Sequence, residues 1–311
     1  MNALASGVSY VDLHFQGLPR IIASVVLQDA GGVAVIDPGP TSTLPALESA
    51  LAGAGLPMAE IRAVLLTHIH LDHAGAAGTI VRRCPHVRVY VHEKGTPHLV
   101  DPSKLLASAA RLYGDAMDRL WGEVRPVPPD AITTLHGGEV LPAGGRHLQV
   151  AYTPGHASHH VSFFSADTGI AFVGDTAGVR VVPGGFNVPA TPPPDVDLEV
   201  WRGSLARIRA WGAQTLFITH FGPHQPVAAH LSEFEERLDL TSQLVKESLE
   251  REGSDEDRER WFADQMRGAL RRHVGDAEAR SYETAGRFDL NWRGLARYWR
   301  KMSSPAVSDR P

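Results

Sequence analysis

The 311-residue sequence predicts an α+β fold that ends in a helical extension. Short apolar runs bounded by turn residues, such as 64–66 and 170–173, are typical of buried strands. Towards the C-terminus, helical periodicity with mixed charges replaces them, as in residues 235–251. A hydrophobic content of 43% in a chain of this length is enough for a large core. We therefore expect one large domain, residues 1–252, and a helical extension, residues 253–311.

The β-rich part is expected to begin with paired strands in residues 8–37. The sequence Asp-Ala-Gly-Gly at 29–32 is a hairpin signal between two apolar runs. An insertion of about residues 93–134 carries apolar residues at helical spacing from Ser103 onward. We expect its helices to pack on the domain surface, and the alternative is a lid that forms one wall of a pocket.

Residues 67–75, Thr-His-Ile-His-Leu-Asp-His-Ala-Gly, follow an apolar strand and contain four side chains of the kind that bind metals. His68 and His70 are two residues apart and point the same way if the strand geometry persists. Asp72 and His73 can then serve a second ion where the chain enters a helix. A merely polar surface loop is the alternative, but it does not explain four ligands in six positions. The segment predicts a metal site at the end of a strand.

This nonapeptide is the signature of the metallo-β-lactamase superfamily, and other segments resemble that family in the required order. Asp37 ends an apolar run upstream, and His156 follows Thr-Pro-Gly. Asp175 and His220 each end a further apolar run. Each piece is weak alone, but five pieces in a fixed order make chance agreement improbable. The resemblance covers about residues 8–225 and implies a four-layer αββα sandwich.

By this resemblance, seven side chains would hold two metal ions. One ion would be held by His68, His70 and His156, the other by Asp72, His73 and His220, and Asp175 would bridge them. Imidazoles and carboxylates without a thiolate suit two Zn²⁺ ions, and also iron or manganese. The family's metal-bridging hydroxide would be the nucleophile, and Asp72 would orient it and carry its proton. The resemblance thus implies a dinuclear metal-dependent hydrolase.

Further residues are predicted around this centre. Asp37 and His160 are expected to support the ligands from behind, although a turn former and a strand-entry residue are equally good explanations. The segment around Phe15 and Leu18 falls where family members carry a loop over the metal site. Phe186 and Asn187 belong to a loop rich in Pro and Gly that starts soon after Asp175. We expect these last four side chains in the substrate pocket.

The extension 253–311 is too rich in aromatic residues to be a solvated tail. We expect it to wall the substrate pocket, as the helical extension of glyoxalase II does, and the alternative is the interface of a homodimer. Cys84 is the only cysteine, so no disulfide can form within the chain.

Charge and hydropathy restrict the partners. The chain has 30 basic and 35 acidic residues and a pI near 6.3, whereas nucleases of this fold cover phosphates with basic surface. A small-molecule substrate is therefore expected, rather than nucleic acid. No apolar run approaches the roughly 18 residues of a membrane span, and no signal peptide is visible, so a cytoplasmic protein without a membrane partner is expected.

These features favour the glyoxalase II and lactonase branch, whose members cleave a small ester, thioester or lactone with the full ligand set. Asp175 argues against a true β-lactamase, and His70 against a flavodiiron protein, which typically has glutamate there. Three alternatives remain: a mononuclear iron persulfide dioxygenase-like enzyme, a phosphodiesterase or nuclease of the same fold, and a non-catalytic binding module. The last would need a broken ligand set, which this chain does not have.

Overall fold

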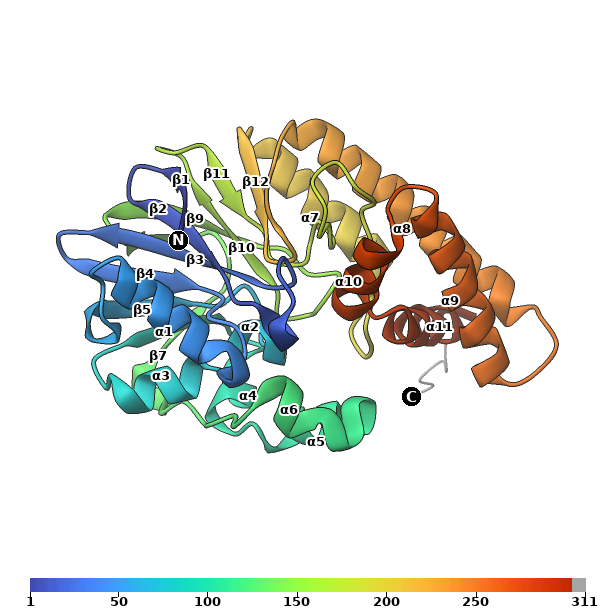
Figure 1. The fold of residues 1–311 in the computed structure, drawn as a ribbon, viewed down its shortest axis with the longest axis horizontal. Helices are drawn as coiled ribbons and strands as arrows, with labels where there is room; N and C mark the ends of the chain where they lie inside the picture. The colour runs from blue at the N-terminus through green and yellow to red at the C-terminus, as the bar shows by residue number, and fades with distance from the viewer. Residues whose placement is uncertain (304–311) are drawn as a thin grey trace, which may run out of the picture.

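The computed structural model describes residues 1–303, so the predicted extension is described up to Ser303. Its centre is formed by two β-sheets that lie face to face (Figure 1). In the first sheet the order is β1 (Asn2–Ala5), β2 (Val8–Asp12), β3 (Ala23–Asp29), β4 (Gly32–Ile36), β5 (Ile61–Leu65), β6 (Arg88–His92) and β7 (Ile132–Leu135). In the second the order is β13 (Gly222–His224), β12 (Thr215–Ile218), β11 (Ile170–Phe172), β10 (Val161–Ser165), β9 (Arg146–Tyr152) and β8 (Val140–Ala143).

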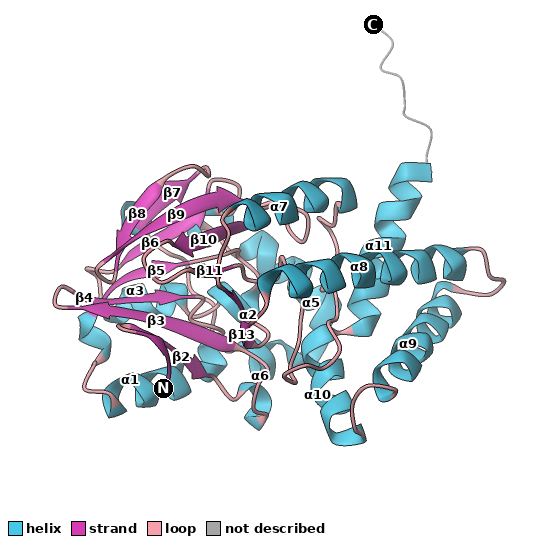
Figure 2. Cartoon of the chain, turned by 90° about the horizontal axis from the view of Figure 1, so that it is seen from above, coloured by secondary structure: helices cyan, strands magenta, loops and turns pink. Residues whose placement is uncertain are grey.

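Helices cover the outer faces of both sheets (Figure 2). The helices of the described residues are α1 (Leu44–Gly53), α2 (Leu71–Ala74), α3 (Ala77–Arg83), α4 (Thr96–Val100), α5 (Ser103–Tyr113), α6 (Met117–Trp121), α7 (Leu198–Ala210), α8 (Val227–Leu249), α9 (Asp255–Arg271), α10 (Asp276–Gly286) and α11 (Phe288–Ser303). The last three pack against α8 and one another rather than on a sheet. The predicted insertion contains α4, α5 and α6, between β6 and β7. None of the helices among residues 1–303 is both long enough and apolar enough to cross a bilayer.

The sheets are buried on both faces because successive side chains of a strand point to opposite sides. In β5, Leu65 packs into the layer between the sheets, together with Phe163 and Phe217 of the second sheet. Its neighbour Val64 points the other way, into the layer beneath the helices. This arrangement confirms the predicted four-layer sandwich and explains why central strands such as β4 and β11 are apolar runs.

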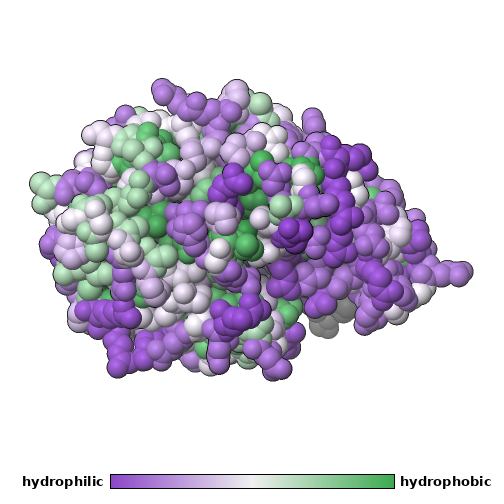
Figure 3. All heavy atoms as spheres, in the orientation of Figure 1, coloured by the Kyte–Doolittle hydropathy of each residue, from purple (hydrophilic) through white to green (hydrophobic). Residues whose placement is uncertain are grey.

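The C-terminal helices pack on the chain itself. Helix α9 starts with a capping box between Ser254 and Asp257, and α11 lies against α8 and α9. Trp292 is buried, and its Nε1 donates a hydrogen bond to Ser248 Oγ at 2.7 Å. On the face shown in Figure 3 the outer surface of this region is mostly hydrophilic, so its large apolar residues are turned inward. A domain boundary at residue 252 remains a prediction, because α8 precedes it and packs with the helices that follow.

Candidate metal centre

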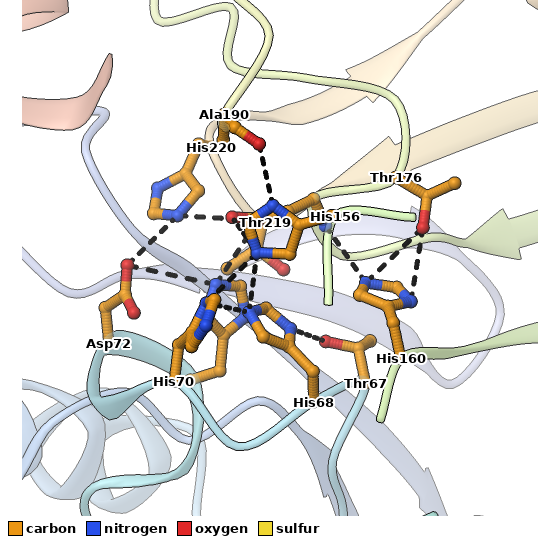
Figure 4. A network of polar contacts seen from close by, with 12 residues as sticks. Thr67, His68, His70, Asp72, His156, His160, Thr176, Ala190, Thr219 and His220 are labelled. Atoms are coloured by element: carbon orange, nitrogen blue, oxygen red, sulfur yellow. Dashed lines mark hydrogen bonds and ion pairs between the residues drawn. The ribbon is translucent and has the colours of Figure 1, made fainter. Parts of the chain in front are cut away.

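The ligand candidates lie where strands end. Strand β5 leads into the loop with His68 and His70, and β9 leads into the loop with His156. Asp175 follows β11, and His220 follows β12. Because β11 and β12 run parallel, their carboxyl ends lie at the same edge of the sheet. Residues that are up to 152 positions apart therefore meet at one edge of the sandwich (Figure 4).

Three imidazoles converge on one point. His68 Nε2 lies 2.9 Å from His70 Nδ1, and His156 Nε2 lies 3.0 Å from His70 Nδ1 and 3.3 Å from His68 Nε2. Ligand nitrogens bound tetrahedrally to zinc at about 2.0–2.1 Å are separated by about 3.3 Å. The three nitrogens therefore have nearly the spacing that a shared metal ion requires.

A second group lies beside the first. His73 Nε2 is 3.2 Å from Asp175 Oδ1, and His220 Nε2 is 3.4 Å from Asp72 Oδ2 and 3.5 Å from Asp175 Oδ1. Asp175 also lies next to the first group, since its Oδ2 is 3.6 Å from His156 Nε2. Within residues 1–303, His73 Nε2 and Asp175 Oδ1 are buried and have no hydrogen-bond partner. Such unpartnered atoms are costly, and a metal ion between them would satisfy both.

The two groups differ in charge. Burial, together with the neighbouring histidines, lowers the pKa of His68 well below its usual value, and burial lowers that of His70 to about 4. These imidazoles are neutral at pH 7, so their lone pairs are available to a cation. Burial also acts on His73, but Asp175 and other carboxylates outweigh it and raise the pKa of His73 well above its usual value. Without metal, a proton on His73 therefore takes the place of a cation in the second group.

The carboxylates of this group remain ionised. Burial opposes ionisation of Asp72, but His73 and His220 outweigh it and lower the pKa of Asp72 to about 2. His220 acts in the same way on Asp175, and the pKa of Asp175 falls well below its usual value despite burial. A cluster of ionised carboxylates beside neutral imidazoles is a site for divalent cations.

Asp37 holds His73 from behind. Its backbone is in the left-handed region, with φ of 50°, which is uncommon for a residue other than glycine. Its Oδ2 accepts hydrogen bonds from His73 Nδ1 at 2.8 Å, Thr67 Oγ1 at 2.7 Å and Thr219 Oγ1 at 3.0 Å, and its Oδ1 accepts from Thr67 N at 2.8 Å. Because a carboxylate only accepts, His73 Nδ1 must donate, and its Nε2 is left to face Asp175.

Backbone carbonyls orient two other imidazoles. His156 Nδ1 donates to Ala190 O at 2.8 Å, and His220 Nδ1 donates to Ile21 O at 2.6 Å. In both rings Nε2 is thereby directed at the neighbouring ligands. The loop before β3 and the proline-rich loop thus support ligands, a role that no sequence motif indicated.

The structure places His160 beside the ligands but not among them (Figure 4). Its ring stacks on that of His68 with centroids 4.9 Å apart, and its Nε2 accepts a hydrogen bond from Asp175 N at 3.3 Å. Gly174 permits this approach. It has φ of 50°, and a Cβ there would lie 2.6 Å from both His160 Nε2 and Thr67 Oγ1.

A cavity of about 320 Å³ opens over the centre and is lined by five of the seven ligand candidates. Helix α5 and the start of α11 form two of its walls. The expectation that the insertion only packs on the domain surface is therefore corrected, because the apolar face of α5 borders the cavity instead. The lining also includes part of the extension, from Ala285 to Asn291.

The four predicted pocket residues lie in different parts of the structure. Phe15 lines a neighbouring cavity of about 350 Å³ that also touches Asp72 and His220, whereas Leu18 packs against the core. Phe186 and Asn187 lie outside both cavities, which corrects the prediction for them. Phe186 packs beneath the Arg237 guanidinium, and the Asn187 side chain is turned inward to Ala177 O and His230.

Sequence reasoning missed several residues. Thr67 and Thr219 bind Asp37 through their hydroxyl groups, and both flank ligands in the sequence, which is the one signal that could have found them. His159 lines the cavity next to His70, and its ring lies 5.7 Å from that of His70 between centroids. Tyr113 also borders the cavity, and burial raises its pKa above the usual value.

Comparison with known proteins agrees with this geometry. Residues 17–220 match the model of the family described as the metallo-beta-lactamase superfamily. The chain belongs to this superfamily. Its curated relatives include the metallo-beta-lactamase fold-containing protein ST1585 of Sulfurisphaera tokodaii, 31% identical over 147 residues, which are 46% of this chain and 54% of that one. A hydroxyacylglutathione hydrolase of Synechococcus is 30% identical over 148 residues, 48% of this chain and 45% of the relative.

A probable metallo-hydrolase of Bacillus subtilis, YqgX, is 35% identical over 113 residues, 36% of this chain and 48% of the relative. The chain thus spans about half the length of the curated relatives it matches. Among solved structures, the superfamily protein TTHA1429 from Thermus thermophilus superposes with a TM-score of 0.73 at 24% identity and covers 96% of this chain and 95% of that one. At this identity the likeness shows the shared fold.

Proposed function

We propose that this protein is a dinuclear metal-dependent hydrolase that cleaves a small ester, thioester or lactone. One observation carries the proposal: seven His and Asp side chains form adjacent groups that share Asp175, and they open onto a cavity of ligand size. The relatives named hydroxyacylglutathione hydrolase and probable metallo-hydrolase support hydrolysis as the reaction class.

We assign two ions, preferably Zn²⁺, to the two groups. His68, His70 and His156 would hold one ion, Asp72, His73 and His220 the other, and Asp175 would contact both. When bound, the ions would supply Lewis acidity and a water that ionises near neutral pH. Iron and manganese also suit this donor set.

The chain's own residues would accept a proton during the reaction and limit the access of water. The Asp72 side chain is 26% exposed and lines the cavity, so one of its carboxylate oxygens can accept a proton from the attacking water. Its low pKa, about 2, keeps it ionised at neutral pH. The apolar wall of α5 limits access of bulk water to the substrate.

Metal analysis combined with a substrate panel tests the proposal. We expect about two zinc ions per chain, and hydrolysis of at least one class among thioesters, lactones and aryl esters that chelation abolishes and zinc restores. His68→Ala should lose both metal and activity, whereas the exposed His147→Ala should keep both. A single ferrous iron with persulfide oxidation, or cleavage of phosphodiesters alone, would overturn the proposal in favour of another enzyme of this fold.

A further inference from the structure

The cavity over the metal centre has an apolar middle. Helix α5 contributes Leu105, Ala109 and Leu112, and α11 contributes Leu290. Leu105 and Leu112 are only partly buried although they belong to the apolar stripe of the helix, because that stripe borders the cavity. An apolar group of a ligand would complete their burial, which is favourable at about 25 cal/mol per Å².

The mouth of the same cavity is cationic. Lys94 and Lys104 are exposed lining residues, and His98 lies between them in the sequence. The chain has only four lysines and a net charge of −5, yet two of the four line this cavity. Two ammonium groups thus line this cavity, near the carboxylate of Asp195.

The two lysines are held differently. Lys94 Nζ donates to Tyr152 Oη at 2.8 Å, and Tyr152 Oη donates to Ser158 O at 2.8 Å, so the ammonium group is fixed at the rim. Lys104 lies in the first turn of α5 and makes no hydrogen bond or ion pair with any residue of the described chain. The nearby carboxylate of Asp195 accepts from Ser158 Oγ at 2.5 Å and also attracts the ammonium group of Lys94.

We propose that Lys94 and Lys104 form a subsite for an anionic end group of the substrate, a carboxylate or a phosphate. The substrate would be an ester, thioester or lactone with an apolar body in the cavity and the anion at the mouth. The reaction class in this inference rests on the proposed function, whereas binding of an anion by the two lysines does not. Because both lysines are partly solvated, the anion preference should weaken as salt is added.

A matched pair of substrates tests the subsite. The N-acetylcysteamine half-thioester of octanedioic acid ends in a carboxylate, and its methyl ester has the same length without the charge. We expect the wild type to prefer the acid. The single variants Lys94→Met and Lys104→Met should each lower kcat/KM for the acid about tenfold, through a higher KM. The methyl ester should change less than twofold in both variants.

The control is Lys301→Met, an exposed lysine of α11 outside the cavity, which should change neither substrate. Metal content should be the same in all variants. A third substrate that ends in a phosphate monoester distinguishes the two kinds of anion. The end group is identified by the substrate, acid or phosphate, whose kcat/KM falls more in the lysine variants. Equal losses for the acid and its methyl ester, or no loss for any anion, would overturn the subsite.

A binding measurement separates this inference from the proposed function. The thioether analogue of the octanedioic substrate cannot be hydrolysed, so its affinity can be measured by calorimetry on metal-loaded protein. If the wild type cleaves none of the three substrates but the lysine variants bind the analogue about tenfold more weakly, thioester hydrolysis fails and the subsite stands. If cleavage occurs and analogue binding is unchanged in the variants, the hydrolase stands and the subsite fails.

Discussion

Replacing Asp37 by asparagine should remove a metal ion without unfolding the protein. In the wild type, Asp37 Oδ1 accepts from Thr67 N, and Oδ2 accepts from His73 Nδ1 and two hydroxyl groups. An asparagine must keep its oxygen at the backbone N–H group, so its NH₂ group would face His73. His73 Nδ1 would then have to accept, and its proton would move to Nε2, the atom that faces Asp175.

The magnitudes follow from these contacts. A proton on His73 Nε2 blocks the lone pair that a metal needs, and changes behind a ligand usually cost 10- to 100-fold in metal affinity, or about 1.4 to 2.7 kcal/mol. In Asp37→Asn the two hydroxyl groups can rotate to accept, so few groups lose a partner. In Asp37→Ala, by contrast, Thr67 N and His73 Nδ1 lose their only acceptor, at about 1–3 kcal/mol each. We therefore expect Asp37→Ala to destabilise the metal-free fold by about 2–6 kcal/mol.

Elemental analysis after dialysis and urea unfolding of the metal-free protein measure the two effects separately. Asp37→Asn should retain about one metal per chain and lose less stability than Asp37→Ala, although the lost charge no longer raises the pKa of His73, whereas Asp37→Ala should lose both metal and stability. Full occupancy of both sites in Asp37→Asn would refute the reasoning, because it would show that the tautomer of His73 does not depend on this carboxylate.

Three further outcomes are expected. His68→Ala should abolish most metal loading, whereas His160→Ala, which touches the ligands only from outside, should lower the hydrolysis rate by about 10- to 100-fold; a larger loss in His160→Ala would show that the two roles are reversed. Metal-free protein should lose stability as the pH rises above about 7.5. Carboxylates raise the folded-state pKa values of His73 and His220 despite burial, so the stabilisation from their bound protons is complete below the unfolded value of about 6.5 and disappears as they deprotonate. A urea midpoint that stays constant from pH 7.5 to 9.5 would contradict this. Asn291→Ala should destabilise the fold by about 1–3 kcal/mol in urea and lower the affinity for substrate, since Asn291 borders the cavity and its Oδ1 accepts a buried backbone N–H of the proline-rich loop at 2.8 Å; wild-type stability and KM would exclude this role.

The sequence was sufficient for the parts of this protein that depend on local chemistry. Metal ligands need particular residue types at short spacing, so one loop was enough to propose His68, His70, Asp72 and His73 as ligand candidates. Central strands such as β4 and β11 could be predicted too, because burial on both faces makes them apolar runs. The structure agrees on both points, with the nonapeptide at the end of β5 and the ligand candidates gathered at one edge of the sandwich.

The tertiary structure decided everything that depends on which side of an element faces the cavity. The periodicity of α5 shows an apolar stripe but not what covers it, and the structure turns that stripe to the cavity. Phe186 and Asn187 follow Asp175 closely in sequence, yet the chain folds them away from the site. Lys94 and Lys104 belong to no motif, and only the tertiary structure places them at one cavity. Sequence spacing fixes local direction, whereas a cavity is defined by contacts between distant segments.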